Sequence, residues 1–246
     1  MIASLPMYDR PETAAANDRL WQGVRARLGY GPNALSRDGD LWDDWLSPDL
    51  LLSQTCGYPY RARLHGKVTL VGSPVLALPD CPAGYYYSVF VARAEDPRAA
   101  VQDYATARFA YNEALSQSGW AAPQTWAAAR GFAFSNPIQS GAHRASARAV
   151  AEGRADIAAL DALSWSIMRQ HDAFTDDLCV LARTEPTPAL PYITALQRDP
   201  AALRCPLHDA IVGLAVEDRA TLGLVGLTMI PAQDYLALPN PAPPSP

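Results

Sequence analysis

The stretch SNPIQSGAHRASARAVAEGRADIAALD, residues 135–161, passes from a short apolar segment through a helical pattern into a second apolar segment. Its centre is Ser140-Gly141-Ala142-His143, which places a serine, a glycine and an imidazole where a helix over 141–153 is expected to begin. Helix starts often carry such residues as caps, and they also expose unpaired backbone N–H groups. The stretch therefore predicts one strand-turn-helix-strand unit.

The same alternation extends along the chain and predicts an α/β protein with a mainly parallel sheet. Apolar residues recur at helical spacing from Leu20 to Leu28, which predicts a helix over 17–28 that ends at Gly29. Further helices are expected at 118–130, 162–171 and 200–213. Strands are expected at 2–8, 49–56, 67–78, 85–93, 107–112, 131–136 and 155–161. The proline-rich segment 183–194 is typical of a connection and not of a strand interior.

This order of elements predicts two α/β lobes. Residues 1–94 and 200–236 are assigned to lobe 1, and residues 95–199 to lobe 2. The tail, 237–246, is rich in proline and is expected to be disordered. Two extended crossings between lobes imply a cleft, and small ligands commonly bind in such clefts.

Composition excludes several partner classes. The chain has 20 basic and 25 acidic residues, a net charge of -5, and no Lys/Arg-rich block, so no nucleic-acid partner is expected. No long apolar run is present, so the protein is not expected to be embedded in a membrane. The first ten residues, MIASLPMYDR, lack a basic start and an apolar core. The chain as encoded is therefore expected to be cytoplasmic, or periplasmic if it is a mature form.

The metal-binding residue types show no metal-site spacing. The four cysteines have no C-x-x-C pattern, and the four histidines have no i, i+4 partner, so no metal or cofactor is expected. The cysteines fit either reduced, buried thiols or two disulfides, Cys56–Cys81 and Cys179–Cys205. The acidic segment 38–49, DGDLWDDWLSPD, departs from a calcium loop and predicts an acidic helix start.

Two segments place serine and glycine at a helix start after a short strand, namely YNEALSQSGW at 111–120 and FSNPIQSGAH at 134–143. The unpaired N–H groups and the positive end of each helix dipole favour an anion there. The candidate residues are Ser116, Ser118 and Gly119 in the first segment and Ser140, Gly141 and His143 in the second. Ser118 and Ser140 also fit simple N-caps, each worth about 1 kcal/mol without any ligand.

Catalytic alternatives lack a motif. Ser118, His143 and Asp161 are the residue types of a hydrolase triad, yet no G-x-S-x-G elbow is present. Neither a G-x-x-x-x-G-K-[ST] loop nor a G-x-G-x-x-G turn occurs, so nucleotide binding has no support from motifs.

Four segments together resemble a known family. IASLPMYD, SQTCGYPY, SQSG and above all SGAHRASARAVAEGRADIAALDALSW resemble phosphonate-type, PhnD-like substrate-binding proteins of ABC transporters. The resemblance covers about residues 2–236. It implies the two-lobed type II periplasmic binding protein fold, with a ligand cleft between the lobes, and a non-catalytic protein that closes around a small oxyanion such as phosphonate, phosphite or phosphate. An ABC transporter permease is the implied partner.

The resemblance also implies ligand contacts. The matching positions are Ser116, Ser118, Gly119, His143 and Asp161, with Tyr8 and Tyr58 from the first lobe. Asp161 fits a helix N-cap equally well. Gln117 stands where the family has a hydroxyl residue, so one oxyanion contact is replaced by an amide or absent. Two alternatives remain open on the same fold: a cytoplasmic enzyme, as in some menaquinone- and thiamine-pathway proteins, and an anion-sensing module.

Overall fold

The computed structural model describes residues 1–244, and within them the chain forms two compact units. Unit 1 comprises Met1–Tyr85 and Pro188–Ala237, and unit 2 comprises Tyr86–Thr187 together with the chain from Leu238 onward. These limits differ from the predicted limits at 94/95 and 199/200. The cause is strand pairing: Ser88–Arg93 pairs inside unit 2, and Tyr192–Ala195 pairs inside unit 1.

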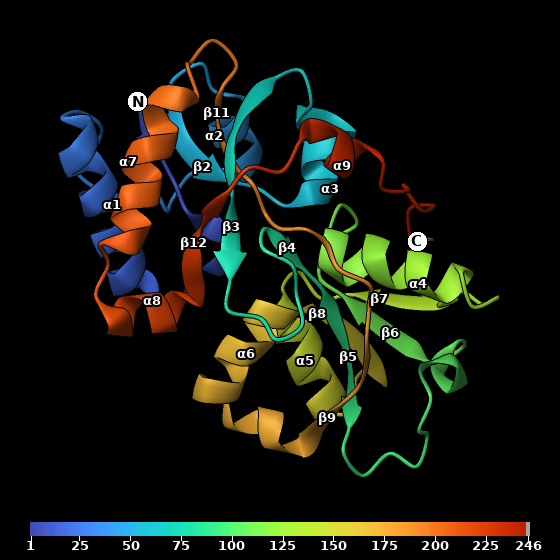
Figure 1. Cartoon of the computed structure of the whole chain (residues 1–246). Coiled ribbons are helices and arrows are strands. Elements are labelled where there is room, and N and C mark those ends of the chain that lie inside the picture. Colours follow the sequence, from blue (N-terminus) through green and yellow to red (C-terminus); the bar gives the residue numbers. More distant parts are fainter. Residues whose placement is uncertain (245–246) are drawn as a thin grey trace. The chain divides into compact units, whose positions relative to one another are not determined.

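Unit 1 is built on a five-stranded sheet (Figure 1). Its strands, in the order β1-β2-β11-β3-β12, are β1 (Ile2–Ala3), β2 (Leu50–Gln54), β11 (Tyr192–Ala195), β3 (Val68–Leu76) and β12 (Leu224–Thr228). Only β1 and β2 pair in parallel, whereas β11 runs antiparallel to both of its neighbours and β12 runs antiparallel to β3. The expectation of a mainly parallel sheet is therefore wrong for this unit.

Strand β11 corrects the prediction for 183–194. The prolines of that segment end at Pro191, immediately before β11, where they interrupt no ladder hydrogen bond of the strand. All four residues of β11, Tyr192–Ala195, are buried, and the strand occupies the centre of the sheet. The proline content correctly predicted a connection before the strand, but it led to the wrong prediction for the strand itself. Before it, β10 (Thr187–Pro188) pairs with β4 (Tyr85–Tyr86) as a separate two-stranded sheet.

Helices cover the sheet of unit 1. They are the 3₁₀ turn Pro6–Tyr8, α1 (Ala14–Leu28), α2 (Leu41–Leu46), α3 (Gly57–Pro59) with the π-helix Tyr60–Leu64, α7 (Ala201–Val212), α8 (Val216–Leu222) and α9 (Ala232–Leu236). Helix α1 packs against α7 and ends at Gly29 in the left-handed conformation, as the sequence predicts. Asp40 caps α2 by accepting hydrogen bonds from the Trp42 and Asp43 amides, which confirms the acidic helix start.

One cluster of the core in unit 1 joins the first and last parts of the chain. Trp45, Leu50, Ile193 and Tyr235 belong to a single buried group of side chains. The hydroxyl of Tyr235 lies 2.6 Å from Ser73 Oγ and 2.7 Å from the Ala189 carbonyl oxygen. Helix α9 is therefore held in the core by packing and by hydrogen bonds.

Unit 2 has a mixed five-stranded sheet in the order β7-β6-β8-β5-β9. The strands are β5 (Ser88–Arg93), β6 (Arg108–Tyr111), β7 (Asn136–Gln139), β8 (Ile157–Asp161) and β9 (Leu178–Arg183). Strands β7, β6 and β8 are parallel, and β5 runs antiparallel to β8 and β9. Because β6 and β8 are parallel neighbours, the segments that follow them leave the sheet at the same edge.

The helices of unit 2 follow the predicted strand-helix rhythm. They are α4 (Ala122–Ala128) after a π-helical turn at Gln117–Ala121, α5 (His143–Ala151) and α6 (Ala162–His171), with 3₁₀ turns at Val101–Tyr104 and Ala173–Asp177. The predicted strand 131–136 is displaced, since β7 begins only at Asn136. Its apolar signal comes from Phe134, which is buried and stacked on Phe109 with ring centroids 4.2 Å apart.

The C-terminal tail differs in part from the prediction of disorder. It has no helix or strand through Pro244, yet from Leu238 onward it belongs to unit 2, where Trp120 Nε1 donates a hydrogen bond of 3.0 Å to the carbonyl oxygen of Ala242. Residues 245–246, also part of that prediction, lie outside the described residues.

The four cysteines, Cys56, Cys81, Cys179 and Cys205, are present as thiols and not as disulfides, which agrees with the reduced alternative. Over residues 1–244, no helix has the length and apolar character needed to cross a bilayer.

Candidate anion-binding site

The two serine-glycine turns of unit 2 meet at a hydrogen bond. Ser118 Oγ lies 2.8 Å from His143 Nε2, although the two residues are 25 positions apart in the sequence. Ser118 follows β6 and His143 begins α5, so the parallel pairing of β6 with β7 and β8 brings the segments together. The convergence that the sequence predicts for these two turns is therefore present in unit 2.

The first turn is organised by Ser116. Its hydroxyl oxygen accepts a hydrogen bond of 2.9 Å from the Gly119 amide, which makes Ser116, and not Ser118, the N-cap of the helix. The hydroxyl of Ser118 is thereby left to contact His143. Ser116, Gln117 and Ser118 are all buried, and the Gly119 N–H is committed to the cap.

The second turn uses its serine internally. Ser140 Oγ lies 2.7 Å from Ser146 Oγ and 3.1 Å from the Tyr111 carbonyl oxygen, while the Ser140 amide donates to the same carbonyl at 2.8 Å. Ala142 occupies the N-cap position of α5 and offers no side-chain cap, so Ser140 is not that cap. The first-turn N–H groups of α5 thus have no capping side chain.

The electrostatic state of His143 follows from its burial. The residue is half-buried overall, but Nδ1 is enclosed and has no hydrogen-bond partner of normal geometry within the described residues. Burial lowers the pKa of the imidazole to about 4, and the nearby backbone of Ala159 offsets only part of this effect. At neutral pH the ring is therefore uncharged.

Asp161 is 2% exposed at the carboxyl end of β8 and caps α6, since its Oδ1 accepts a 2.7 Å hydrogen bond from the Ser164 amide. The cap that the sequence allowed is thus present. A carboxylate has further acceptor capacity, so the cap does not use up the side chain.

The two candidate tyrosines lie in unit 1. Tyr8 ends the 3₁₀ turn after β1 and lines a shallow pocket of unit 1. The pocket is lined mostly by apolar side chains, with Gln54 and Tyr192 among the polar ones. Tyr58, on α3, does not line this pocket; it is buried, and the Arg61 guanidinium lies over its ring at 4.3 Å. The pocket beside Tyr8 therefore does not include Tyr58.

Sequence patterns missed Asn112, the residue that follows β6. Its carbonyl oxygen accepts a hydrogen bond of 3.0 Å from the Gly141 amide. A Cβ placed on Gly119 would lie 1.9 Å from Asn112 Oδ1. One asparagine thus touches both turns. A lone asparagine after a strand carries no motif, so only the packing reveals it.

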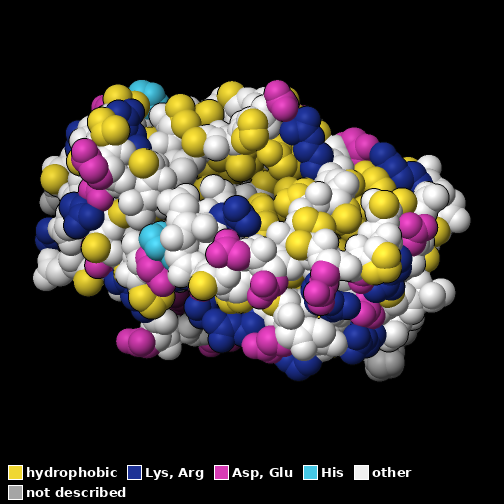
Figure 2. Space-filling model, turned by 90° about the horizontal axis from the view of Figure 1, so that it is seen from below, with side chains coloured by type: hydrophobic (Ala, Val, Ile, Leu, Met, Phe, Trp, Pro, Cys, Tyr) yellow, Lys and Arg dark blue, Asp and Glu magenta, His cyan; other side chains and the backbone are white. Residues whose placement is uncertain are grey.

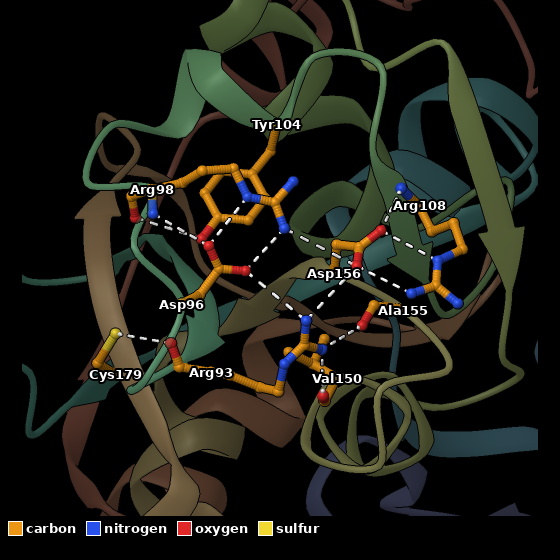
Figure 3. A network of polar contacts seen from close by, with 9 residues as sticks. All are labelled: Arg93, Asp96, Arg98, Tyr104, Arg108, Val150, Ala155, Asp156 and Cys179. Carbon is orange, nitrogen blue, oxygen red and sulfur yellow. Dashed lines mark hydrogen bonds and ion pairs between the residues drawn. The ribbon is translucent and has the colours of Figure 1, made fainter.

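The amino ends of the same strands carry a charge network (Figure 3). Arg108, at the start of β6, binds Asp156 through two side-chain hydrogen bonds of 3.0 and 2.9 Å. Arg98 binds Asp96 in the same way, at 2.9 and 2.7 Å, and Arg93 reaches both carboxylates. The network lies before β6 and β8, whereas the candidate site lies after them.

The face shown in Figure 2 carries acidic and basic side chains close together, with no broad area of one sign. Within residues 1–244, no group of His, Cys, Asp and Glu side chains has an arrangement that could hold a metal ion.

A family model described as "ABC transporter, phosphonate, periplasmic substrate-binding protein" matches residues 57–235, well over half of the chain. The chain belongs to this family. The phosphonate-type binding proteins are substrate-binding components of transporters and not enzymes. The matched region of this family member contains Tyr58 and both turns of unit 2. No curated protein matches the chain.

Solved structures confirm the two-lobed type II periplasmic binding protein fold of this phosphonate-type protein. PhnD1 from Prochlorococcus marinus in complex with methylphosphonate has a TM-score of 0.74 at 15% identity, over 95% of this chain and 94% of that one. A binding protein component of an ABC phosphonate transporter from Pseudomonas aeruginosa has a TM-score of 0.72 at 15% identity, over 96% of this chain and 82% of that one. A histidine kinase sensor domain with similarity to periplasmic binding proteins has a TM-score of 0.62 at 16% identity, over 92% of this chain and 97% of that one.

Proposed function

We propose that this protein binds a small oxyanion, a phosphonate, phosphite or phosphate, at the paired turns of unit 2. The hydrogen bond between Ser118 Oγ and His143 Nε2 carries the proposal, because it joins two helix starts whose dipoles both favour negative charge. Capping alone does not require this contact, since Ser116 is the cap of the first helix.

Each residue then has a distinct part in the proposal. When the anion binds, Ser118 O–H and His143 Nε2–H exchange their mutual hydrogen bond for donation to the anion, together with first-turn N–H groups of the two helices. Ser116 and Ser140 hold the shape of the turns through their own hydrogen bonds. Gly119 leaves room for Asn112. Asp161 accepts a hydrogen bond from a protonated oxygen or another polar group of the ligand.

Unit 1 supplies the remaining contacts in this proposal. Tyr8 has a place beside a mostly apolar pocket, which suits the organic substituent of a phosphonate. Tyr58 is proposed to contact the ligand once the Arg61 guanidinium moves from its ring. In this proposal a ligand that contacts both units favours a closed state. It shifts the equilibrium by the difference between its binding free energies for the closed and the open state.

Isothermal titration calorimetry with methylphosphonate, phosphite, phosphate and sulfate tests the proposal. Wild-type protein is expected to bind at least one of these anions. The changes Ser118→Ala and His143→Ala should each weaken binding about ten- to a hundred-fold, the loss of one hydrogen bond to a charged group. Ser166→Ala, an exposed serine of unit 2 on α6, is the matched control and should bind as the wild type does. Absence of binding to all four anions would contradict the proposal.

The partner in this proposal is an ABC transporter permease, and the place of action is the periplasm. Membership of a periplasmic substrate-binding family supports both. Uptake of a phosphonate as sole phosphorus source, lost on gene deletion and not restored by the Ser118→Ala variant, is the expected result.

A second candidate, an anion-sensing module, is favoured by the similarity of fold to a histidine kinase sensor domain. Anion-dependent capture of a signalling protein, without any effect of gene deletion on uptake, would favour the sensor over the transport receptor.

A further inference from the structure

Asn112 connects the two turns of unit 2 through different parts of the same residue. Its main-chain carbonyl oxygen accepts from the Gly141 amide, in the second turn. Its side-chain carboxamide lies against Gly119, in the first turn, where a Cβ would lie 1.9 Å from Oδ1 and 3.1 Å from Cγ. Only glycine leaves room for the carboxamide at this distance. The position of Asn112 is therefore fixed on both sides.

The carboxamide is not explained by its contacts within the protein. Oδ1 is enclosed and has no hydrogen-bond partner among the described residues. A buried carbonyl oxygen without a donor destabilises the folded state, and an apolar side chain of similar size would avoid the cost. Each unsatisfied polar atom of this kind in a native structure needs an explanation, and a functional role is one of the recognised explanations.

The other end of the carboxamide is the part that can serve a ligand. Asn112 is half-buried. Within residues 1–244 its Nδ2 group makes no hydrogen bond, and it is not one of the buried polar atoms that lack a partner. Nδ2 carries two N–H donors, and contact with Gly119 holds the plane of the group. Ser118, the hydroxyl residue proposed to bind the anion, is the neighbour of Gly119 in the chain.

We propose that Asn112 is a further ligand-binding residue of this site, which donates from Nδ2 to an oxygen of the bound oxyanion while Oδ1 packs on Gly119. The inference rests on the proposed function of the two turns and adds a neutral, preoriented donor to them. This role also accounts for the unpaired Oδ1, because the function of the carboxamide then depends on its N–H donors and not on its acceptor oxygen. The expected ligand presents an acceptor oxygen at this position, as phosphonate and phosphate do.

Two substitutions separate donation from packing. Asn112→Asp keeps the shape of the side chain but replaces the donors by a negative charge, so affinity for methylphosphonate should fall at least about a hundred-fold. Asn112→Ala removes the donors and the unpaired oxygen together, so affinity should fall about ten-fold. The ligand-free unfolding midpoint of Asn112→Ala should stay within a few degrees of the wild-type value. Asn136→Asp, on exposed β7, is the control and should bind as the wild type does.

Titration calorimetry with methylphosphonate and inorganic phosphate, with thermal unfolding in parallel, decides the matter. The role of Asn112 is overturned if both variants bind with wild-type affinity. It is also overturned if Asp and Ala weaken binding equally and in proportion to their loss of ligand-free stability. Either result leaves the proposed function intact. Absence of anion binding by the wild type overturns both. If Asn112→Asp does not fold, a ten-fold loss in a stable Asn112→Ala supports the proposal, and unchanged affinity in that variant overturns it.

Discussion

Ser118 Oγ lies 2.8 Å from His143 Nε2, while Nδ1 of the same ring is enclosed without a partner. The pair therefore consists of a hydroxyl and a neutral imidazole, and the third member of a hydrolase triad is missing because no carboxylate accepts from Nδ1 within the described residues. The family to which the chain belongs agrees, since its members bind substrates and do not transform them.

The first prediction concerns acid sensitivity. Burial holds the pKa of His143 at about 4 in the folded protein, against an ordinary value of 6.5. Between these values the unfolded state binds the extra proton, so the free energy of unfolding falls as the pH is lowered from 6.5 towards 4, by up to about 3 kcal/mol. Urea titrations at pH 7 and 4.5 measure the change. His143→Gln should lose less stability over this interval than the wild type, and an equal loss in both proteins would contradict the burial of a neutral ring.

The second prediction concerns the network of Figure 3. The Arg108 guanidinium lowers the pKa of Asp156 to about 2 from 3.8, so this carboxylate stabilises the fold above pH 3.8, and its contribution is lost as the pH falls towards 2. Because Arg108 is 42% exposed, the contribution at neutral pH is about 1–2 kcal/mol. Asp156→Asn should lower the free energy of unfolding by that amount at pH 7. Asp176→Asn, at an exposed site of unit 2, should leave it unchanged.

The third prediction tests the contact between Gly119 and Asn112. Gly119→Ala places a Cβ 1.9 Å from Oδ1 and 3.2 Å from Ser116 Oγ, so the turn must shift, at a cost of about 1–3 kcal/mol. Adding Asn112→Ala removes the closer obstacle, and the double variant should therefore be more stable than Gly119→Ala alone. Chemical denaturation of the single and double variants measures this coupling. Gly226→Ala, where a Cβ meets nothing nearer than 4.0 Å, is the control.

The fourth prediction concerns unit 1. Tyr235→Phe removes a buried hydroxyl that lies 2.6 Å from Ser73 Oγ and donates to the Ala189 carbonyl oxygen at 2.7 Å. The free energy of unfolding should fall by about 1–3 kcal/mol, because the carbonyl loses its donor while it stays buried. Tyr30→Phe, at a tyrosine that is 43% exposed, should have little effect on the same denaturation curve.

Local signals in the sequence predicted much of the fold and the convergence of the two turns that form the candidate site. The two serine-glycine turns, the helix stop at Gly29 and the acidic start of α2 depend on neighbouring residues, and each has a clear pattern. Strand β11 was hidden because prolines precede it, and its burial depends on strands far away in the sequence. The displacement of β7 has a similar cause, since Phe134 packs on Phe109 without joining the sheet.

Features that depend on contacts between distant residues could not be predicted. Asn112 gains its position from Gly119 and Gly141, neither of which is a neighbour in the chain. Likewise, Arg108 meets Asp156 only because β6 and β8 align in parallel. The assignment of the first helix cap to Ser118 followed the usual spacing, but a π-helical turn moves the cap to Ser116.

The bond from the Trp120 indole to the Ala242 carbonyl gives unit 2 a built-in optical signal. Trp120 stands two positions beyond Ser118 and is 3% exposed, so its fluorescence is sensitive both to its N–H partner and to small movements of the adjoining turn. Trimming the chain after Ala237 would free the indole N–H and shift the emission. Because the chain has six tryptophans, this emission reports on the surroundings of Ser118 in a variant in which the other five are replaced.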